Sequence, residues 1–331
     1  MEELLQKIKK SGLVGRGGAG FPTYKKWEMT RATPDDRKFV ICNACEGEIG
    51  VFKDLYILEN YPEKVMDGII LTLDFLDTKD AYLYFNSSYW KQVKSKFVPL
   101  ITKYEVLGYK ITVHEEEPSY IGGEETTLLN SIEGHRIEPR LKPPLPSLVG
   151  LHEHATLIQN VETFYDISLI NENEYKKERF YSLSGKIKHP GVFCLSDKLS
   201  IEDILKKTGN VPSFDYFVQI GGSASGLVLN KDQLKSHKMI GAGSIEIYPT
   251  STSPRSMFYK WFTFYYNENC GKCTPCREGT YQLCRIIKEE RETNIKSILE
   301  IVDLMEAASF CGLGKSISVP VKSYIKNVLK K

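Results

Sequence analysis

Three closely spaced cysteines in the last quarter of the chain are the residues whose types and spacing most directly indicate chemistry. Cys270, Cys273 and Cys276 follow one another with two residues between neighbours, and Cys311 comes later. Structural zinc sites usually use two separated ligand pairs or mixtures of Cys and His. Three thiolates at this spacing with a remote fourth are typical of an iron–sulfur cubane. The pattern favours a [4Fe–4S] cluster, with zinc or merely buried thiols as alternatives.

Helices are predicted on both sides of this cysteine group. Thr274 and Pro275 suit the start of a helix, so one should begin near Cys276. A second, antiparallel helix would return Cys311 to that end, where the positive end of the helix dipole favours a negatively charged cluster. Three other cysteines are interpreted as buried structural thiols: Cys42, Cys194 and Cys284.

A glycine-rich segment near the N-terminus, Gly15–Pro22, could bind a phosphate or a flat ring. Its glycines allow positive φ angles and close backbone approach. No predicted strand precedes it and its spacing differs from G-x-G-x-x-G, so it is not the dinucleotide fingerprint. Three cations lie in or near it, although such charges are usually solvated: Arg16, Lys25 and Lys26.

Two polar turns add candidate ligands. The turn Asn43–Glu48 comes directly after a predicted strand, and ligands of open α/β sheets bind at the carboxyl ends of strands. The turn Tyr120–Glu125 leads into a helix predicted over Glu125–Ile132. Glutamates at a helix N-terminus are explained equally well by the helix dipole.

The first half of the chain alternates strand and helix patterns, which predicts an α/β fold with parallel strand pairs. Helices are predicted at Met66–Leu76 and Tyr89–Tyr104, with Pro99 expected to kink or end the second. The predicted strands are Lys38–Ala44, Ala81–Asn86 and Tyr109–Glu115.

The second half changes character twice. The charged stretch Asn171–Arg179 is interpreted as a linker or solvated helix. Tyr181–Leu195 and Phe217–Tyr248 are rich in strand patterns and glycine turns, which predicts a small β-containing domain. From about Pro254 the pattern is helical again.

Composition excludes several classes of protein. The 331 residues include 44 Lys and Arg against 42 Asp and Glu, so no global positive field indicates nucleic acid. The apolar stretch Ile69–Leu76 is too short to cross a bilayer, and the acidic start Met1–Glu3 does not resemble a secretory signal. We therefore expect a cytoplasmic protein without direct membrane insertion, whose eight cysteines do not form a disulfide framework.

Several segments, in order along nearly the whole chain, resemble the NADH-binding flavoprotein subunit of respiratory complex I and its relatives in soluble hydrogenases and formate dehydrogenases. Gly15–Trp27 resembles the family's GRGGAGFPTGxKW segment, and Cys42–Tyr56 resembles CNADEGEPGTFKDRY. The other matching segments are Gly123–Thr127, Arg140–Pro146, Gln159–Thr163, Ser184–Val192 and the cysteine group with Cys311.

The resemblance implies three domains: a Rossmann-like FMN and dinucleotide domain at 1–172, a ubiquitin-like SLBB β-grasp domain at 173–250, and a helical bundle with one [4Fe–4S] cluster at 251–331. It also implies that NADH reduces FMN, which passes electrons singly to the cluster and then to a partner protein. The cofactors supply this chemistry, and the protein supplies placement and electrostatics.

The resemblance implies the following site residues. Glu46 and Glu48 are the expected catalytic residues. The expected metal ligands are Cys270, Cys273, Cys276 and Cys311. The expected contacts to FMN and NAD(H) are Gly15, Arg16, Gly17, Gly18, Lys26, Asn43, Glu46, Tyr120, Gly123, Glu124, Glu125, Gln159, Asn160 and Thr163.

Several departures from the family pattern concern the nucleotide. Cys45 replaces an acidic residue, Tyr24 a glycine, Leu145 a phenylalanine and Gln159 an asparagine, and Met29 stands where the family has a second aromatic. Two lost stacking rings forfeit about 0.5–1.5 kcal/mol each. Cys45 is either a small neutral filler or a thiol that tunes the flavin or ligates something.

These departures leave more than one functional hypothesis. The first is a redox subunit that transfers electrons between NAD(P)H and a partner through FMN and one [4Fe–4S] cluster. The second is an FMN and iron–sulfur relay that has lost nicotinamide binding and exchanges electrons with ferredoxin or another redox subunit. The third is a ligand-binding scaffold with structural zinc. The resemblance favours other redox subunits as partners: a thioredoxin-like [2Fe–2S] subunit and a further iron–sulfur subunit.

Overall fold

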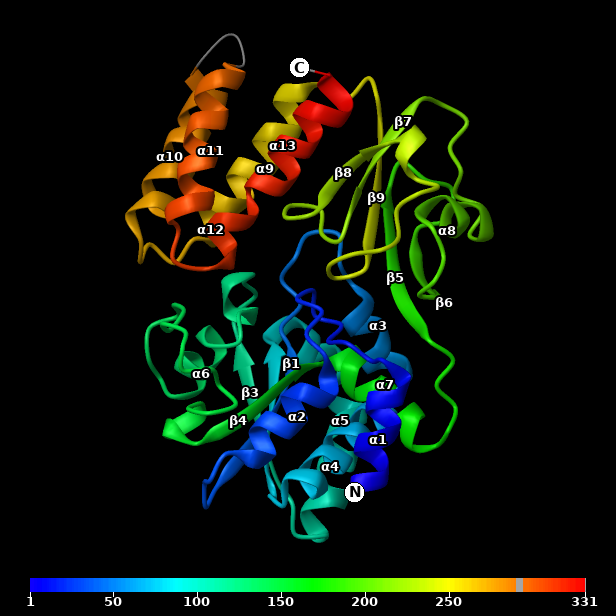
Figure 1. The fold of residues 1–331 in the computed structure, drawn as a ribbon, viewed down its shortest axis with the longest axis vertical. Coiled ribbons are helices and arrows are strands. Elements are labelled where there is room, and N and C mark those ends of the chain that lie inside the picture. Colours follow the sequence, from blue (N-terminus) through cyan, green and yellow to red (C-terminus); the bar gives the residue numbers. More distant parts are fainter. Residues whose placement is uncertain (290–293, 331) are drawn as a thin grey trace. The chain divides into compact units, whose positions relative to one another are not determined.

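The computed structural model describes residues 1–289 and 294–330 and divides them into two compact units (Figure 1). The first unit contains residues 1–47 and 52–179. The second contains residues 48–51 and the described residues from 180 onward. The division into three domains at 172/173 and 250/251 stays a prediction.

The first unit is built on a parallel sheet with the strand order β3-β2-β1-β4. Its central strand β1 is buried along most of its length, which explains its nearly continuous apolar sequence. The prediction of parallel strand pairs is confirmed. The strands are β1 (Lys38–Ala44), β2 (Asp80–Asn86), β3 (Lys110–Glu116) and β4 (Ala155–Asn160).

Helices cover this sheet, and two of them are packed unusually closely. A Cβ atom at Gly68 would lie 2.0 Å from the carbonyl oxygen of Phe164, so only glycine permits this approach of α4 to α7. The helices of this unit are α1 (Glu2–Ser11), α2 (Thr23–Ala32), α3 (Lys53–Asn60), α4 (Pro62–Leu76), α5 (Ser87–Val106), α6 (Thr127–Ile132) and α7 (Val161–Asn171), with short 3-10 turns at Ile121–Gly123 and Leu151–Glu153.

Helix α6 packs its apolar side chains against one face of the sheet. Leu128 and Leu129 of α6 belong to one buried cluster with Phe39 and Ile41 of β1. These two β1 residues have the same parity as Asn43, so they share one face of the strand. This packing fixes the turn that precedes α6 against the end of β1.

Pro99 does not end the helix, one of the two expected effects, because α5 continues through it to Val106. Pro99 is exposed, whereas Val93 and Phe97 on the other side of the helix are buried. Water can satisfy the carbonyl that loses its hydrogen bond on the exposed side, and the buried side holds the helix together.

The second unit contains a mixed five-stranded sheet with the strand order β6-β5-β9-β7-β8. Strand β5 pairs in parallel with β9, and β7 pairs antiparallel with both β8 and β9. Helix α8 (Ile201–Lys207) adds Ile201, Ile204 and Leu205 to the core of this sheet. The strands are β5 (Glu178–Gly185), β6 (Gly191–Ser196), β7 (Tyr216–Ile220), β8 (Leu227–Asn230) and β9 (Ser244–Pro249).

Cys194 is exposed, which corrects the expectation that it is a buried thiol. It lies in β6, a strand at the edge of the sheet along which no residue is fully buried. Cys42 and Cys284 are buried as expected.

The rest of the second unit is helical, as the sequence predicts. Trp261, Phe258 and Tyr324 form an aromatic cluster, and the indole nitrogen of Trp261 donates to Gln219 of β7 at 3.1 Å. No helix in residues 1–289 and 294–330 is long and apolar enough to cross a membrane. The helices are α9 (Pro254–Glu268), α10 (Thr274–Glu289), α11 (Ile295–Ala308), α12 (Gly312–Ser316) and α13 (Ser318–Tyr324), followed by a π-helical turn at Ile325–Leu329.

Candidate flavin and iron–sulfur sites

Two asparagines mark the carboxyl ends of the neighbouring strands β1 and β4. Asn43 and Asn160 are paired directly across the strands. The amide nitrogen of Asn43 donates to the carbonyl of Gly123 at 2.8 Å, and its oxygen accepts from the backbone N–H of Cys45 at 3.1 Å. Asn160 caps α7 by accepting from the N–H of Glu162 at 3.0 Å. The expected ligand-binding edge therefore carries a fixed pair of amides.

The glycine-rich loop lies against this edge. The backbone N–H of Gly15 donates to the carbonyl of Phe21 at 2.9 Å, which closes the loop at its base. A Cβ atom at Gly17 would lie 3.2 Å from the Cβ of Asn160, and Gly18 has a φ of 116°. The exposed backbone from Gly17 to Gly20 is therefore shaped for close approach by a phosphate or ring, which fits a flavin nucleotide.

Arg16 is part of the interior rather than of the exposed loop. Its guanidinium donates to Asp166 at 3.1 Å and to the hydroxyl of Tyr175 at 2.8 Å, and the residue is buried. Its backbone N–H donates to Thr163 at 3.0 Å. A contact between Arg16 and a bound nucleotide would come from the backbone, because the guanidinium joins the loop to α7.

A group of buried ionisable side chains lies beside Asn160. The ammonium of Lys53 is 2.5 Å from a carboxylate oxygen of Asp54 and 3.1 Å from Glu162. Asn160 donates to the second oxygen of Asp54 at 2.5 Å. Burial lowers the pKa of Lys53, but Asp54 and Glu162 outweigh this effect and raise it overall. Lys53 therefore stays charged.

Glu46 is hydrogen-bonded to this group and is less buried than Lys53 and Asp54. The backbone N–H of Asp54 donates to both of its carboxylate oxygens at 3.1 Å, and the hydroxyl of Tyr89 donates to one of them at 3.1 Å. Burial, followed by repulsion from Asp54, raises the pKa of Glu46 to about 8. Glu46 can thus exchange a proton near neutral pH.

The turn before α6 carries a second charged group. Glu124 accepts from the backbone N–H groups of Thr126 and Thr127, both at 2.9 Å, so it caps α6. Lys142 lies 2.7 Å from Glu124 and 3.1 Å from Glu125. This arrangement supports the interpretation that at least Glu124 is placed there by the helix N-terminus.

Lys26 and Glu125 link the glycine-rich side of the unit to this turn. The ammonium of Lys26 is 3.2 Å from Glu125 and donates to the carbonyl of Ile158 in β4 at 3.0 Å. Burial raises the pKa of Glu125, but Lys26 and Lys142 outweigh burial and lower it overall. The carboxylate is therefore ionised at neutral pH.

The other expected contacts lie in the same unit. Gln159 accepts from the indole nitrogen of Trp27 at 3.3 Å. Tyr120 precedes the 3-10 turn that carries Gly123, and a Cβ at Gly123 would lie 2.8 Å from the carbonyl oxygen of Cys45. Cys45 is buried, and its thiol is 3.5 Å from the carbonyl of Ser119.

Glu48 belongs to the second unit. Its carboxylate accepts from the backbone N–H groups of Ala224 at 2.8 Å and Ser225 at 3.2 Å, and from the Ser225 hydroxyl at 2.6 Å. These bonds give Glu48 a structural role. The catalytic roles expected for Glu46 and Glu48 stay predictions.

Sequence reasoning did not single out Lys53, Asp54, Tyr89 or Glu162. Lys53 and Asp54 stand at the start of a helix, a place where charged residues are usually solvated. Both lie within the segment Cys42–Tyr56, and the resemblance of this segment to the family is the signal in the sequence that could have identified them.

The four expected cysteine ligands gather at one end of the helices of the second unit. Cys270 and Cys273 lie between α9 and α10, Cys276 lies in the first turn of α10, and Cys311 directly precedes α12. Burial, followed by the neighbouring Cys273, Cys311 and Cys270, raises the pKa of Cys276 to about 12. The four cysteines are therefore neighbours in the fold, and their role as the metal ligands stays a prediction.

The spacing of these sulfurs distinguishes a cluster from a single ion. Within the described residues, three side chains have possible metal-binding atoms that all lie within 4.8 Å of one another: Asp35, Asp36 and His154. No three of the cysteines in this part of the chain are gathered so closely. A single tetrahedral zinc requires sulfurs about 3.8 Å apart, given Zn–S bonds of ~2.3 Å. The cysteine sulfurs are not gathered as closely as a single zinc requires, which favours a [4Fe–4S] cubane over zinc. The backbone N–H of Phe310 also points to the sulfur of Cys273 at 3.4 Å.

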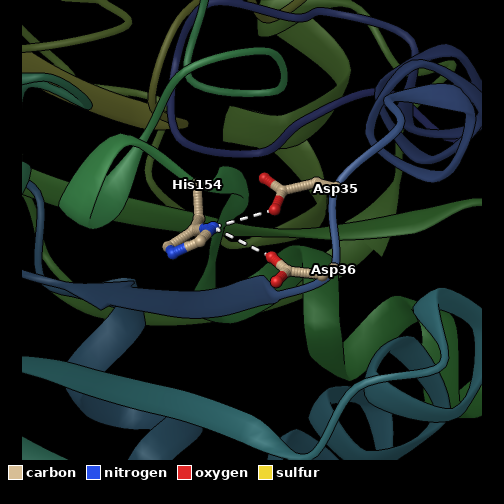
Figure 2. A group of neighbouring side chains, drawn as sticks. All are labelled: Asp35, Asp36 and His154. Carbon is tan, nitrogen blue, oxygen red and sulfur yellow. Dashed lines mark hydrogen bonds and ion pairs between the residues drawn. The ribbon is translucent and has the colours of Figure 1, made fainter.

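The compact group of Asp35, Asp36 and His154 is explained by the fold (Figure 2). One oxygen of Asp35 is 2.8 Å from His154 Nδ1 and accepts from the N–H of Arg37 at 3.1 Å, and the other accepts from the N–H of Ala155 at 2.7 Å. Burial raises the pKa of Asp35, but these hydrogen bonds outweigh it and lower the pKa to about 2. Asp35 thus joins the starts of β1 and β4.

This fold and these two sites define a class of protein: an electron-transfer subunit that binds FMN in one unit and a [4Fe–4S] cluster in the other. Residues 8–169 match the Nuo51 FMN-binding domain, and residues 256–330 match the NADH-ubiquinone oxidoreductase-F iron-sulfur binding region. The chain belongs to the family of NADH-quinone oxidoreductase subunits that contain these two regions. The predicted resemblance, both cofactors and the oxidoreductase activity are thereby confirmed.

Individual relatives are similar over nearly all of the chain. The NADH-quinone oxidoreductase subunit of Mycobacterium bovis is 32% identical, with 98% of this chain and 83% of the relative aligned. The NADH-quinone oxidoreductase subunit of Rhizobium meliloti is 29% identical, with 98% and 87% aligned. The crystal structure of an NAD+-reducing [NiFe]-hydrogenase in its H2-reduced state matches with a TM-score of 0.90 and 28% identity, and the match covers 98% of this chain and 60% of the hydrogenase chain.

Proposed function

We propose that the chain is the electron-entry subunit of a multisubunit complex and accepts electrons from NADH. The observation that carries the proposal is the close approach of the glycine-rich loop to Asn160, which is paired across the strands with Asn43. This edge of the parallel sheet is where α/β folds bind nucleotides. The family to which the chain belongs is named for NADH-quinone oxidoreductase.

We place the FMN at this edge of the sheet. The backbones of Gly15, Gly17 and Gly18 would approach it: a Cβ at Gly17 would lie 3.2 Å from the Cβ of Asn160, and the φ of 116° at Gly18 favours glycine. Asn43 and Asn160 would orient it through amides that are already held by Gly123 and Glu162. When bound, FMN accepts an electron pair from NADH and passes electrons on one at a time.

We place NADH over the side of this edge that carries the linked charges. Lys26, Glu125 and Lys142 form a continuous ion-pair group there. Phe21 and Leu145 are exposed large apolar residues of the same unit, suited to cover an adenine ring. Leu145 offers no stacking ring, so we expect weaker binding of the dinucleotide than in relatives with an aromatic residue at this position.

The proposal includes the organisation of the whole subunit. We assign residues 1–172 to the FMN domain, 173–250 to an SLBB β-grasp domain and 251–331 to the cluster-bearing bundle. A mixed sheet with α8 against it supports the second assignment. A thioredoxin-like [2Fe–2S] subunit and a further iron–sulfur subunit are the proposed partners, in the cytoplasm, where thiols stay reduced. The matched hydrogenase and the subunit names of the relatives support a multisubunit assembly.

Replacing Gly17 with valine tests the placement of FMN. The added side chain would meet Asn160, whose Cβ already lies 3.2 Å from the position of a Cβ at Gly17. We expect the FMN content per purified chain, measured by fluorescence after release, to fall at least about tenfold. Ala32→Val is the matched control, because Ala32 is exposed at the end of α2 and should keep its full FMN content. Full FMN content in Gly17→Val would show that the flavin binds elsewhere.

A further inference from the structure

The buried ionisable side chains beside Asn160 form a single group, which we call the α7 charge group. Lys53 and Glu162 have side chains that are 1% and 0% exposed, and they are 3.1 Å apart. Asp54 lies between Lys53 and Asn160, at 2.5 Å from each. Charges so deeply buried are stable only when the group as a whole is nearly neutral.

The α7 charge group continues along α7 and is not neutral when every member is ionised. Arg16 is 3.1 Å from Asp166, and Arg179 also acts on Asp166 electrostatically. Among the members named next, four carboxyl groups stand against three cations. Its members are Glu46, Asp54, Glu162 and Asp166 against Arg16, Lys53 and Arg179. The group therefore either holds a proton or carries a net negative charge.

Glu46 is the member through which a proton can be exchanged. It is partly exposed, whereas Asp54, Glu162 and Asp166 are buried. Its carboxylate is held by the Asp54 N–H and the Tyr89 hydroxyl, all at 3.1 Å, so it keeps one position in the site. The pKa of Glu46 is raised to about 8, first by burial and then by Asp54.

The groups that act on Glu46 or on its neighbour Asp54 come from α3, α5, α7 and β1 with the turn after it. Lys53 of α3 lowers its proton affinity, and Asp54 of α3 raises it. The titratable and charged groups around Glu46 and Asp54 are Lys53 and Asp54 of α3, Tyr89 of α5, Glu162 of α7, and Cys42 and Cys45 of β1 and the turn after it. Burial raises the pKa of Cys42, so it stays a neutral thiol.

We infer that Glu46 takes up a proton from solvent when the bound flavin is reduced and releases it when the flavin is reoxidised, and that the excess carboxyl of the α7 charge group favours this uptake. The inference rests on the proposed placement of FMN at the ends of β1 and β4. NADH delivers two electrons and one proton to the ring, which leaves one added negative charge. The proton on Glu46 balances this charge, and both protons return to solvent after two electrons have left.

The slope of the flavin potential against pH measures this proton. Each proton taken up with two electrons lowers the midpoint potential by about 30 mV per pH unit, because a tenfold change in a two-electron equilibrium is 29.6 mV. Uptake by Glu46 occurs above the pKa that it has in the oxidised protein, about 8. At this alkaline pH the reduced ring itself carries one proton. We therefore expect the midpoint potential of the flavin in the unmodified holoprotein to fall by about 60 mV per pH unit between pH 8 and 9.

Glu46→Gln removes the proton-binding carboxylate with little change in shape. The slope should fall to about 30 mV per pH unit across the same range. Glu105→Gln, an exposed substitution on α5 with the same change of charge, should keep the slope of about 60 mV. A slope of about 30 mV in the unmodified protein, or an unchanged steep slope in Glu46→Gln, would overturn the inference.

Tyr89→Phe provides a second variant that keeps the carboxylate. Loss of the 3.1 Å hydrogen bond to Glu46 should raise its proton affinity about tenfold, since bonds to charged groups contribute roughly 1.5–3 kcal/mol. The pH above which the flavin potential falls by about 60 mV per pH unit should therefore rise by about one unit. An unmoved limit would also contradict the inference.

Reduction with dithionite separates this inference from the proposed function, because it does not require bound NADH. If Gly17→Val loses FMN while Glu46→Gln keeps the steep slope, only the proton inference fails. If Gly17→Val keeps its FMN, the placement of the flavin fails first.

Discussion

Cys311→Ala is expected to lose the [4Fe–4S] cluster while the chain keeps its FMN. The unmodified chain should contain about four iron atoms and four acid-labile sulfides. Cys311 directly precedes α12, on a different segment from Cys270 and Cys273, so without it one corner of a cubane has no thiolate. Iron and sulfide should fall by about nine-tenths, and the electron paramagnetic resonance signal of the reduced cluster should disappear. FMN should stay bound, because the proposed flavin residues all lie in the first unit.

Cys284→Ala is the matched control for this substitution. Cys284 is a buried thiol in α10, the same helix that carries Cys276, but it is not among the groups that act on Cys276. Its iron content should equal that of the unmodified chain. Stoichiometric zinc in the unmodified protein, or full iron in Cys311→Ala, would contradict the assignment of the four ligands.

Lys53→Met is expected to destabilise the first unit by about 3–5 kcal/mol, the usual consequence of removing one partner from a buried ion pair. The ammonium of Lys53 lies between Asp54 and Glu162, whose side chains are 4% and 0% exposed. Both carboxylates would be left buried without this cation. Native-state amide hydrogen exchange in β1 and β4 measures the effect on this unit alone.

The pH dependence of Lys53→Met follows from the same contacts. Lys53 lowers the pKa of Asp54, so its removal raises that pKa further above the unfolded value. A carboxyl whose pKa is raised by folding makes the folded state less stable as pH rises from the unfolded to the folded pKa. The loss of stability should therefore be smaller at pH 5 than at pH 8.

Lys64→Met is the control for charge removal. Lys64 pairs with Glu172 at the surface, where the two side chains are 33% and 32% exposed. Such pairs contribute about 0–1 kcal/mol. An equal effect of the two substitutions, or unchanged exchange in Lys53→Met, would show that the α7 charge group does not stabilise the unit.

Three of the four strands in the sheet of the first unit could be predicted from the sequence, whereas β4 (Ala155–Asn160) was missed. The predicted strand Lys38–Ala44 has the same bounds as β1, because its apolar run is buried along a central parallel strand. The iron–sulfur region could also be predicted, since three of its cysteines are close together in the sequence. In both cases the information is local.

Features that depend on distant contacts could not be predicted in the same way. Pro99 ends a helix by local rules, yet the burial of Phe97 and Ile101 keeps α5 continuous. Glu48 stands two residues from Glu46 in the sequence, but its carboxylate is bound by Ala224 and Ser225. Lys53 is indistinguishable by type from a solvated lysine until Glu162 is placed beside it.

Anaerobic titration of the purified holoprotein with NADH tests the central claim most directly, with absorbance following the flavin and electron paramagnetic resonance following the cluster. The account predicts that NADH bleaches the flavin and that the signal of a reduced [4Fe–4S] cluster then appears. A flavin that stays oxidised in excess NADH and NADPH, while dithionite reduces it, would contradict the proposed electron donor and favour a relay without nicotinamide binding. A purified protein with neither flavin nor iron–sulfur absorbance would contradict the account as a whole.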